Sequence, residues 1–186
     1  MKKEKIKSVI IGSNGYIGKN LSFFLHSLKI DNNDYDINDH TAYSWMNYSK
    51  LDITKKNDFY KIDKKTNVIF FMAGLTGTED GFSNYENYFN INVIGLINLL
   101  TFLKERKLKV KIIFPSTRLV YQGKKNIPLK EYDEKNPKSI YALTKLSAEN
   151  TLKLYSKLFN INYNIFRICV PYANFVNNDY SYGTIG

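Results

Sequence analysis

The sequence contains little cysteine, histidine or proline and no long apolar run. A single cysteine, Cys169, cannot form an internal disulfide, and with His26 and His40 it makes no metal-ligand cluster. The first apolar run, Val9 to Ile11, is shorter than the ~7–15-residue core of a signal peptide, and no run approaches the ~18 residues of a membrane span. We therefore expect a cytoplasmic protein without a metal site, in which Cys169 is a small buried thiol.

Acidic residues are outnumbered by basic ones, 17 to 27, which leaves a formal net charge of +10. A positive surface attracts nucleic acid or phosphorylated small molecules. The lysines are dispersed, however, and only Arg106, Arg118 and Arg167 carry forks suited to bidentate contacts. Because a biased composition rich in Lys, Asn, Ile and Tyr accounts for the excess, we predict no nucleic-acid partner and no membrane partner.

Apolar segments alternate with helical patterns along the 186 residues, a length suited to one domain. Predicted strands cover residues 6–11, 67–72, 110–114 and 163–170, and predicted helices begin near residue 17 and cover 88–107 and 139–159. Continuous apolar strands that alternate with helices indicate an α/β fold, with a parallel sheet covered on both faces. A further strand should lie within residues 31–40, although "DNNDYDINDH" is too polar for a convincing one.

The stretch "GSNGYIG" places three glycines between the first predicted strand and the first predicted helix. Glycines at such a turn let a pyrophosphate approach the backbone, and the helix N-terminus then holds the phosphates. Asn14 stands where the commonest fingerprint has its middle glycine, and a turn without a ligand is the alternative. We predict that the cofactor-binding residues of this turn are Gly12, Asn14, Gly15, Tyr16, Ile17 and Gly18.

A site for NAD also needs an acid for the adenosine ribose, about 20 residues further on. Asp36 lies 18 residues after Gly18, and Asp34 and Asp39 are alternatives. No arginine or lysine follows these acids directly, which favours NAD over NADP.

Seven stretches together carry a resemblance to a known family. In chain order they are "GSNGYIG", "LDIT" at Leu51, "FFMAG" at Phe71, "NVIGLINLL" at Asn92, "PSTRLVYQG" at Pro115, "YALTK" at Tyr141 and "FRICVPY" at Phe166. They resemble the extended short-chain dehydrogenase/reductase family, specifically its NAD-dependent nucleotide-sugar epimerases and dehydratases, over residues 5 to about 175. The resemblance implies a Rossmann-like doubly wound sheet, NAD as the cofactor and a nucleotide-sugar substrate, and we expect a homodimer.

The resemblance implies that Thr117, Tyr141 and Lys145 are catalytic. A tyrosine with its usual pKa of ~10 is a poor base, and lowering that pKa to ~7 takes about 4 kcal/mol. Lys145, one helical turn after Tyr141, and the oxidised nicotinamide would supply the positive charge. Tyr141 would then take the proton of a sugar hydroxyl whose oxygen Thr117 holds. The alternatives are an ordinary helix surface for the pair and a turn-capping hydroxyl for Thr117.

Further cofactor contacts follow from the same resemblance. Asp52 and Ile53 would meet the adenine ring, and Ala73 and Gly74 would pass beneath the cofactor. Asn92 would support the active site from a helix, unless it satisfies only the helix backbone. Tyr141 and Lys145 would also contact the cofactor.

Two departures from the family pattern narrow the function. Arg118 and Leu119 replace the Asp-Glu pair that 4,6-dehydratases carry after the threonine, so we favour an epimerase. Arg118 could contact a substrate phosphate or carboxylate, or be an exposed cation. Val170 stands where many epimerases have an asparagine that holds the nucleotide diphosphate.

Family members also continue well beyond this length to build a substrate lobe, which is largely missing here. We therefore predict an NAD-binding domain over residues 1–170 and the start of a truncated substrate-binding lobe over 171–186. The chain could be a fragment, a truncated product or a stand-alone cofactor domain. The expected function is an NAD-dependent nucleotide-sugar epimerase, or its cofactor-binding part, that oxidises a sugar hydroxyl transiently. A non-catalytic NAD-binding module and a related sugar-nucleotide oxidoreductase are the alternatives.

Overall fold

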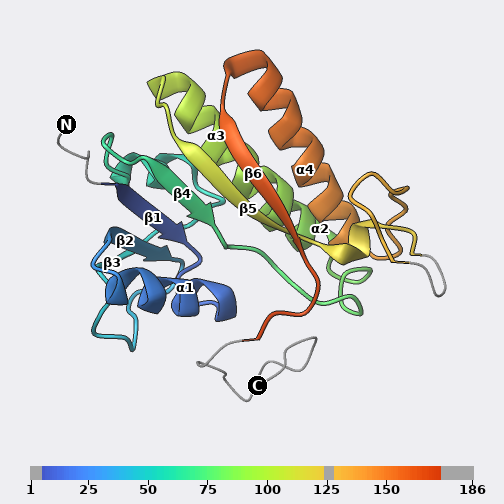
Figure 1. The fold of residues 1–186 in the computed structure, drawn as a ribbon, viewed down its shortest axis with the longest axis horizontal. Helices are drawn as coiled ribbons and strands as arrows, with labels where there is room; N and C mark the ends of the chain where they lie inside the picture. Colours follow the sequence, from blue (N-terminus) through green and yellow to red (C-terminus); the bar gives the residue numbers. More distant parts are fainter. Residues whose placement is uncertain (1–5, 124–127, 173–186) are drawn as a thin grey trace.

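The computed structural model describes residues 6–123 and 128–172, and its centre is an all-parallel six-stranded sheet (Figure 1). The strand order is β3-β2-β1-β4-β5-β6, the order of the doubly wound dinucleotide-binding fold, so the predicted fold class is confirmed. The strands are β1 (Lys7–Ile11), β2 (Asp31–Asp36), β3 (Tyr48–Lys50), β4 (Val68–Phe71), β5 (Lys111–Thr117) and β6 (Asn162–Ile168).

Helices lie on both faces of the sheet. Figure 1 shows α1 (Tyr16–Ser27) on one face, and α3 (Gly95–Arg106) beside α4 (Ile140–Phe159) on the other. The helix predicted over residues 88–107 is a continuous run of three parts: α2 (Tyr85–Phe89), the π-helical turn η2 (Asn90–Ile94) and α3. Two short 3-10 helices, η1 (Lys56–Lys61) and η3 (Arg118–Val120), were not predicted.

The main core lies between the sheet and the layer of α3 and α4. Phe71 of β4 and Phe114 of β5 stack there with ring centroids 6.5 Å apart, and Phe59 stacks on Phe102 at 6.2 Å. On the opposite face the described residues place α1 against β1 and β2. Phe166 of β6 is accordingly 54% exposed on that opposite face. The sheet is thus covered fully on one face and over one half of the other.

β2 forms although five of its six residues are polar. Its side chains replace apolar packing with hydrogen bonds: Asn32 Oδ1 accepts from Ser8 Oγ at 2.9 Å, and Asn33 Oδ1 accepts from Asn47 Nδ2 at 2.6 Å. Tyr35 is the apolar anchor, 5% exposed, with its hydroxyl donating to the Lys61 carbonyl at 3.1 Å. A polar strand is therefore stable here because its polar groups find partners on both neighbouring segments.

The end of β6 corrects one expectation. Cys169 is exposed rather than buried, because it follows the last residue of an edge strand. Residues 173–186 lie outside the described residues, so the predicted start of a substrate lobe stays a prediction. Among the helices of the described part, none has both the length and the apolar character needed to cross a bilayer.

Candidate active site

The glycine turn brings three backbone segments into close contact at the carboxyl end of β1. Gly12 has φ +92°, and a Cβ there would lie 2.4 Å from the Ala73 nitrogen. A Cβ on Gly18 would lie 2.0 Å from the Gly12 oxygen, so α1 can pack this closely only without a side chain. Gly15 is the N-cap of α1 and has no side chain to cap the helix. The N–H groups of the first turn therefore receive no side-chain cap from this residue.

Asp36 is the acid that the structure places at this turn. Its Oδ2 accepts from the Asn14 nitrogen at 2.9 Å and its Oδ1 from the Ile37 nitrogen at 2.7 Å. Asp39 instead pairs with Lys50 at 2.6 Å on the surface. Of the three candidate acids, Asp36 is thus the one that contacts the glycine turn, and its contact with a ribose stays a prediction.

Asp34 points away from the turn, into the protein. It is 2% exposed, and burial raises the pKa of its carboxyl to about 6, although hydrogen bonds from Ser22, Asn32 and the Asn47 backbone act in the opposite direction. Its role is to hold β2 beneath α1 and beside the segment that leads to β3.

Asp52 and Ile53 follow β3 and line the same end of the sheet. Asp52 Oδ1 accepts from the nitrogen and hydroxyl of Thr54, at 3.0 and 2.7 Å. Ile53 is buried, and a Cβ on Gly95 would lie 2.7 Å from its Cδ1. Both residues shape the segment, and their predicted contact with adenine stays a prediction.

Asn92 clamps the loop after β4 to the helix layer. Its Oδ1 accepts from the Leu75 nitrogen at 2.8 Å, and its Nδ2 donates to the Leu75 carbonyl and to Thr144 Oγ1, both at 3.1 Å. Both amide donors are thereby used, which is the behaviour of a positioning residue. A Cβ on Gly74 would lie 2.9 Å from Asn92 Oδ1 and 4.0 Å from Lys145 Nζ, so the loop passes here only as glycine.

Asn92 also lies in the π-helical turn, a rare geometry that occurs often at functional sites. The wider turn interrupts the regular helix at the residue that holds the loop.

Thr117 and Tyr141 meet at the carboxyl end of β5. Thr117 is the last residue of the strand, and Tyr141 is the second residue of α4, which Ser139 caps by accepting from the Ala142 nitrogen at 3.1 Å. Burial raises the pKa of the Tyr141 phenol, and its hydrogen bond with Thr117 acts in the opposite direction. In the protein alone the phenol is therefore neutral at neutral pH, and the lowering expected from Lys145 together with oxidised nicotinamide stays a prediction.

Lys145 lies one turn further along α4 and is 6% exposed. Its Nζ is 4.4 Å from the centroid of the Phe114 ring, and within residues 6–123 and 128–172 it makes no hydrogen bond or ion pair. Burial lowers the pKa of its ammonium to about 8, partly offset by the Glu149 carboxylate. A buried ammonium without a hydrogen-bond acceptor is unfavourable unless a ligand supplies one.

Glu149 and Arg167 form a buried ion pair behind Tyr141 and Lys145, which the sequence analysis missed. Glu149, fully buried, accepts from Ser116 Oγ at 2.6 Å, and from Arg167 Nε and Nη2 at 2.8 and 2.6 Å. Arg167 Nη1 also donates to the Tyr121 hydroxyl at 2.5 Å. Burial alone would raise the pKa of Glu149, but the hydrogen bonds from Arg167 and Ser116 lower it. The spacing of Tyr141, Lys145 and Glu149, four residues apart on one helix face, was the signal available in the sequence.

The arrangement fits a dinucleotide in three respects. The first turn of α1 contains no acidic residue, so its positive end is free to meet phosphates. Ser13 Oγ, beside that turn, is buried without a hydrogen-bond partner in the described structure. The unpaired ammonium of Lys145 lies at the other end of the same edge, where a ribose hydroxyl could accept from it.

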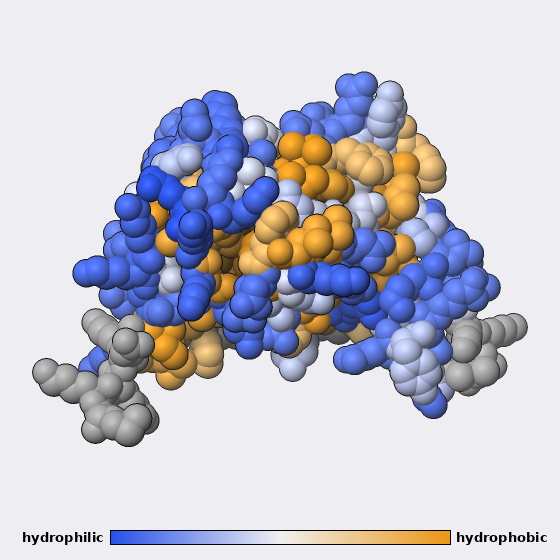
Figure 2. Space-filling view, turned by 90° about the horizontal axis from the view of Figure 1, so that it is seen from above, coloured by the Kyte–Doolittle hydropathy of each residue, from blue (hydrophilic) through white to orange (hydrophobic). Residues whose placement is uncertain are grey.

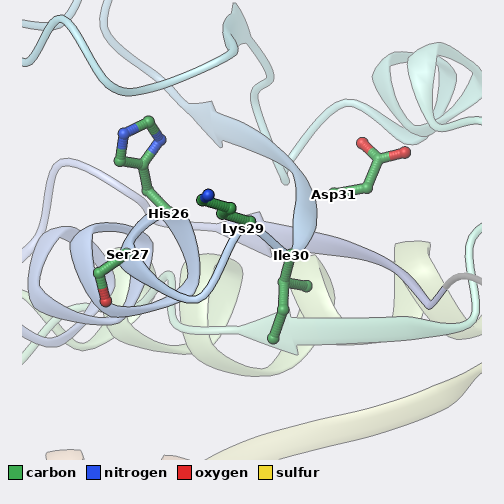
Figure 3. A pocket seen from close by; sticks show the side chains of 5 residues that line it. All are labelled: His26, Ser27, Lys29, Ile30 and Asp31. Atoms are coloured by element: carbon green, nitrogen blue, oxygen red, sulfur yellow. The ribbon is translucent and has the colours of Figure 1, made fainter.

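Of the hollows on the surface of the described structure, one of about 280 Å³ is lined in part by Tyr121, Ser139 and Arg118, the residue after Thr117. A second, of about 600 Å³, lies where α1 leads into β2, and Figure 3 shows its side chains, which come from residues 26–31. The second hollow is at the amino end of β2, whereas ligands of such sheets bind at the carboxyl ends of the strands.

The chain matches the NAD dependent epimerase/dehydratase family over residues 8–184. It is 28% identical to a protein of Methanocaldococcus jannaschii provisionally named UDP-glucose 4-epimerase, over 89% of this chain and 56% of that protein. It is 25% identical to UDP-glucuronate 4-epimerase 1 of Arabidopsis thaliana, over 95% of this chain and 45% of the relative.

A solved epimerase structure has a similar fold. The UDP-glucose 4-epimerase of Brucella ovis, solved in complex with NAD, superimposes with a TM-score of 0.77 at 22% identity, over 91% of this chain and 52% of that one. The chain thus spans about half the length of the proteins it matches.

We predict that Lys145→Met raises the free energy of unfolding of the protein without cofactor by about 1–3 kcal/mol at pH 7, because it removes a buried charge. Between about pH 8 and 10.4 the unfolded chain binds more protons at Lys145 than the folded one, so wild-type stability should rise with pH across that window. The variant should lack this rise.

Urea denaturation from about pH 7 to about pH 10 measures both effects. Lys157→Met, at an exposed position near the end of α4, is the matched control and should leave the pH profile as in wild type. Equal profiles for Lys145→Met and wild type would contradict the buried, unpaired ammonium.

Proposed function

The chain belongs to the NAD dependent epimerase/dehydratase family, and from this premise we propose that it is an NAD-dependent nucleotide-sugar epimerase, or the cofactor-binding part of one. The observation that carries the proposal is the contact of Thr117 with Tyr141 beside the unpaired ammonium of Lys145. A lysine on a helix without a function would not be buried away from every hydrogen-bond acceptor, because nothing would compensate for its desolvation.

NAD would lie across the carboxyl ends of the strands. The turn from Gly12 to Gly18 would hold its pyrophosphate, and Asp36 its adenosine ribose. Asp52 and Ile53 would border the adenine, and Ala73 and Gly74 would leave room beneath the cofactor. Lys145 would donate to the hydroxyls of the nicotinamide ribose. When bound, NAD supplies a hydride acceptor and a positive charge.

The chain's own residues would handle the proton. Thr117 donates to or accepts from the reacting sugar hydroxyl and so fixes its oxygen. Tyr141 takes the hydroxyl proton as the carbon is oxidised. After the oxidised sugar has rotated to present its other face, Tyr141 returns the proton. Because burial raises the pKa of the phenol, both Lys145 and the cofactor charge are needed to make Tyr141 a base.

Arg118 and Leu119 supply neither acid nor base after Thr117, which supports epimerisation over loss of water. Relatives named for glucose and for glucuronate leave the sugar open. Because the chain spans about half of those relatives, a non-catalytic NAD-binding module is the second candidate function. A cytoplasmic location stays a prediction.

We also infer a homodimer, formed through the exposed face of α4. Leu143, Leu154 and Leu158 are 39%, 53% and 60% exposed and fall within one 60° sector of the helix. The neighbouring turn η2 adds Ile94, 44% exposed. Figure 2 shows apolar side chains gathered over the part of the molecule that contains α3 and α4. A second copy offering the same face would bury this surface.

Leu154→Glu should therefore convert a dimer into a monomer, since it places a charge in the centre of the apolar sector. Light scattering coupled to size-exclusion chromatography gives the mass directly. Leu28→Glu, equally exposed at the end of α1, is the matched control. A wild-type chain that is monomeric at every concentration would rule out the homodimer.

For the cofactor, we expect tighter binding of NAD than of NADP, because the Asp36 carboxylate repels a 2′-phosphate. Asp36→Asn keeps an oxygen for the Asn14 nitrogen and removes the charge, so the preference should fall about tenfold. Calorimetric titration with both cofactors tests this, with Asp39→Asn as the control. A wild-type preference for NADP would be inconsistent with the assignment of Asp36.

For the chemistry, Tyr141→Phe in a complete or complemented enzyme should slow the reduction of bound NAD by a nucleotide sugar by about 10²–10⁴-fold, with little change in NAD affinity. Lys145→Ala should lower both the rate and the affinity. The double variant should lose much less than the sum of the two, because the residues act as one unit.

The absorbance of the reduced cofactor follows the rate, and Tyr155→Phe on the same helix is the control. A Tyr141→Phe variant as fast as wild type would remove Tyr141 from the mechanism.

A further inference from the structure

The hollow beside Thr117 has the size and position of a site for part of the sugar. Its volume of about 280 Å³ is near the lower limit of small-molecule sites, ~300–1,000 Å³, so it can take a sugar ring but not a whole nucleotide sugar. Arg118 and Leu119 line it directly after Thr117, and Ser139 lines it two residues before Tyr141. The hollow therefore borders the two chain segments that carry Thr117 and Tyr141, although neither of these residues lines it.

Among the described residues that line the hollow, the two with charged side chains are both positive. Arg118 and Lys138 are exposed there, and within the described ranges neither has an ion pair or a hydrogen bond from its side chain. The other two arginines do have partners: Arg106 lies over the Tyr60 ring at 4.5 Å, and Arg167 pairs with Glu149 at 2.6 Å. Arg118 is thus the arginine whose fork remains available.

Neutral donors and the helix dipole add to the positive potential. Ser139 uses an oxygen lone pair to cap α4, which leaves its hydroxyl proton able to donate into the hollow, and Thr78 lines the opposite wall. The hollow also lies at the N-terminus of the 20-residue helix α4, whose first turn has no acidic residue. All of these groups favour an anion.

We propose that Arg118 and Lys138 form a specificity site for a carboxylate on the sugar, so that the substrate is a nucleotide sugar of the uronate class. The inference rests on the proposed function, since it takes Thr117 and Tyr141 to hold the reacting hydroxyl. A guanidinium fork matches a carboxylate with two parallel hydrogen bonds, and Lys138 adds a point charge.

The other anion of such a substrate is its diphosphate. The hollow is small for a nucleotide and borders the chain segments that carry Thr117 and Tyr141, which favours a substituent of the reacting ring over the diphosphate. A carboxylate on that ring is such a substituent.

The test is the ratio of two dissociation constants, for UDP-glucose and UDP-glucuronate, measured by ligand-detected NMR on the NAD-loaded chain. Wild type should favour UDP-glucuronate by about tenfold or more, since a hydrogen bond to a charged group is worth at least that factor. Arg118→Gln should bring the ratio to about two, with the loss falling on UDP-glucuronate. Arg118→Glu should reverse the preference.

Lys138→Gln should reduce the ratio by a smaller factor, and Lys157→Gln, on the far end of α4, is the control for net charge. Arg118 and Lys138 are exposed, so both variants should fold, and thermal unfolding checks this.

Three outcomes would overturn the proposal. A wild-type ratio near one would remove the selectivity itself while leaving the proposed epimerase function intact. Equal weakening of both ligands by Arg118→Gln would assign the cation to the diphosphate instead. Failure of the NAD-loaded chain to bind either nucleotide sugar would reject this inference and leave only the cofactor-binding part of the proposed function.

Discussion

The buried carboxylate of Glu149 fixes the rest of the site. A charge without access to water is tolerated only when hydrogen bonds and an opposite charge surround it, and Arg167 and Ser116 meet both needs. These partners lie on β6 and β5, so one side chain sets both the rotation of α4 and its position along the sheet. Tyr141 and Lys145 share that helix face and are thereby brought to the end of β5, where Thr117 ends the strand.

Lys145 differs from Glu149 because, among the described residues, its buried ammonium has no hydrogen bond or ion pair and lies only over the Phe114 ring. Its pKa, lowered by burial to about 8, measures a penalty that the folded protein bears in the absence of a ligand. Such local instability is common at functional sites, where a group is held ready for a partner that arrives later. The neutral phenol of Tyr141 follows the same logic, because burial alone disfavours the phenolate. The protein therefore prepares the positions of both groups, and bound cofactor must supply the remaining charge.

The opposite half of the edge is organised by the backbone. A side chain at Gly12 would collide with the Ala73 backbone and one at Gly18 with the Gly12 backbone, and Asp36 braces the turn through the Asn14 nitrogen. The acid expected to recognise a ribose thus also shapes the loop that would meet the phosphates. β2, which carries Asp36, depends on hydrogen bonds of Asn32 and Asn33 rather than on apolar packing, and this explains why its residues do not look like a strand.

The sequence by itself determined the elements whose signal is local. The parallel fold, the glycine turn, the helix that begins after Ser139 and the one-turn spacing of Tyr141 and Lys145 all follow from periodicity, capping and glycine, which act within a few residues. Tertiary structure decided which acid contacts the glycine turn (Asp36, not Asp34 or Asp39), the polar strand β2, the exposure of Cys169, and the ion pair of Glu149 with Arg167. It also decided that the Tyr141 pKa is raised and that Arg118 faces a hollow. Each of these features depends on burial and on partners far away in the chain. Burial and distant partners cannot be read from neighbouring residues.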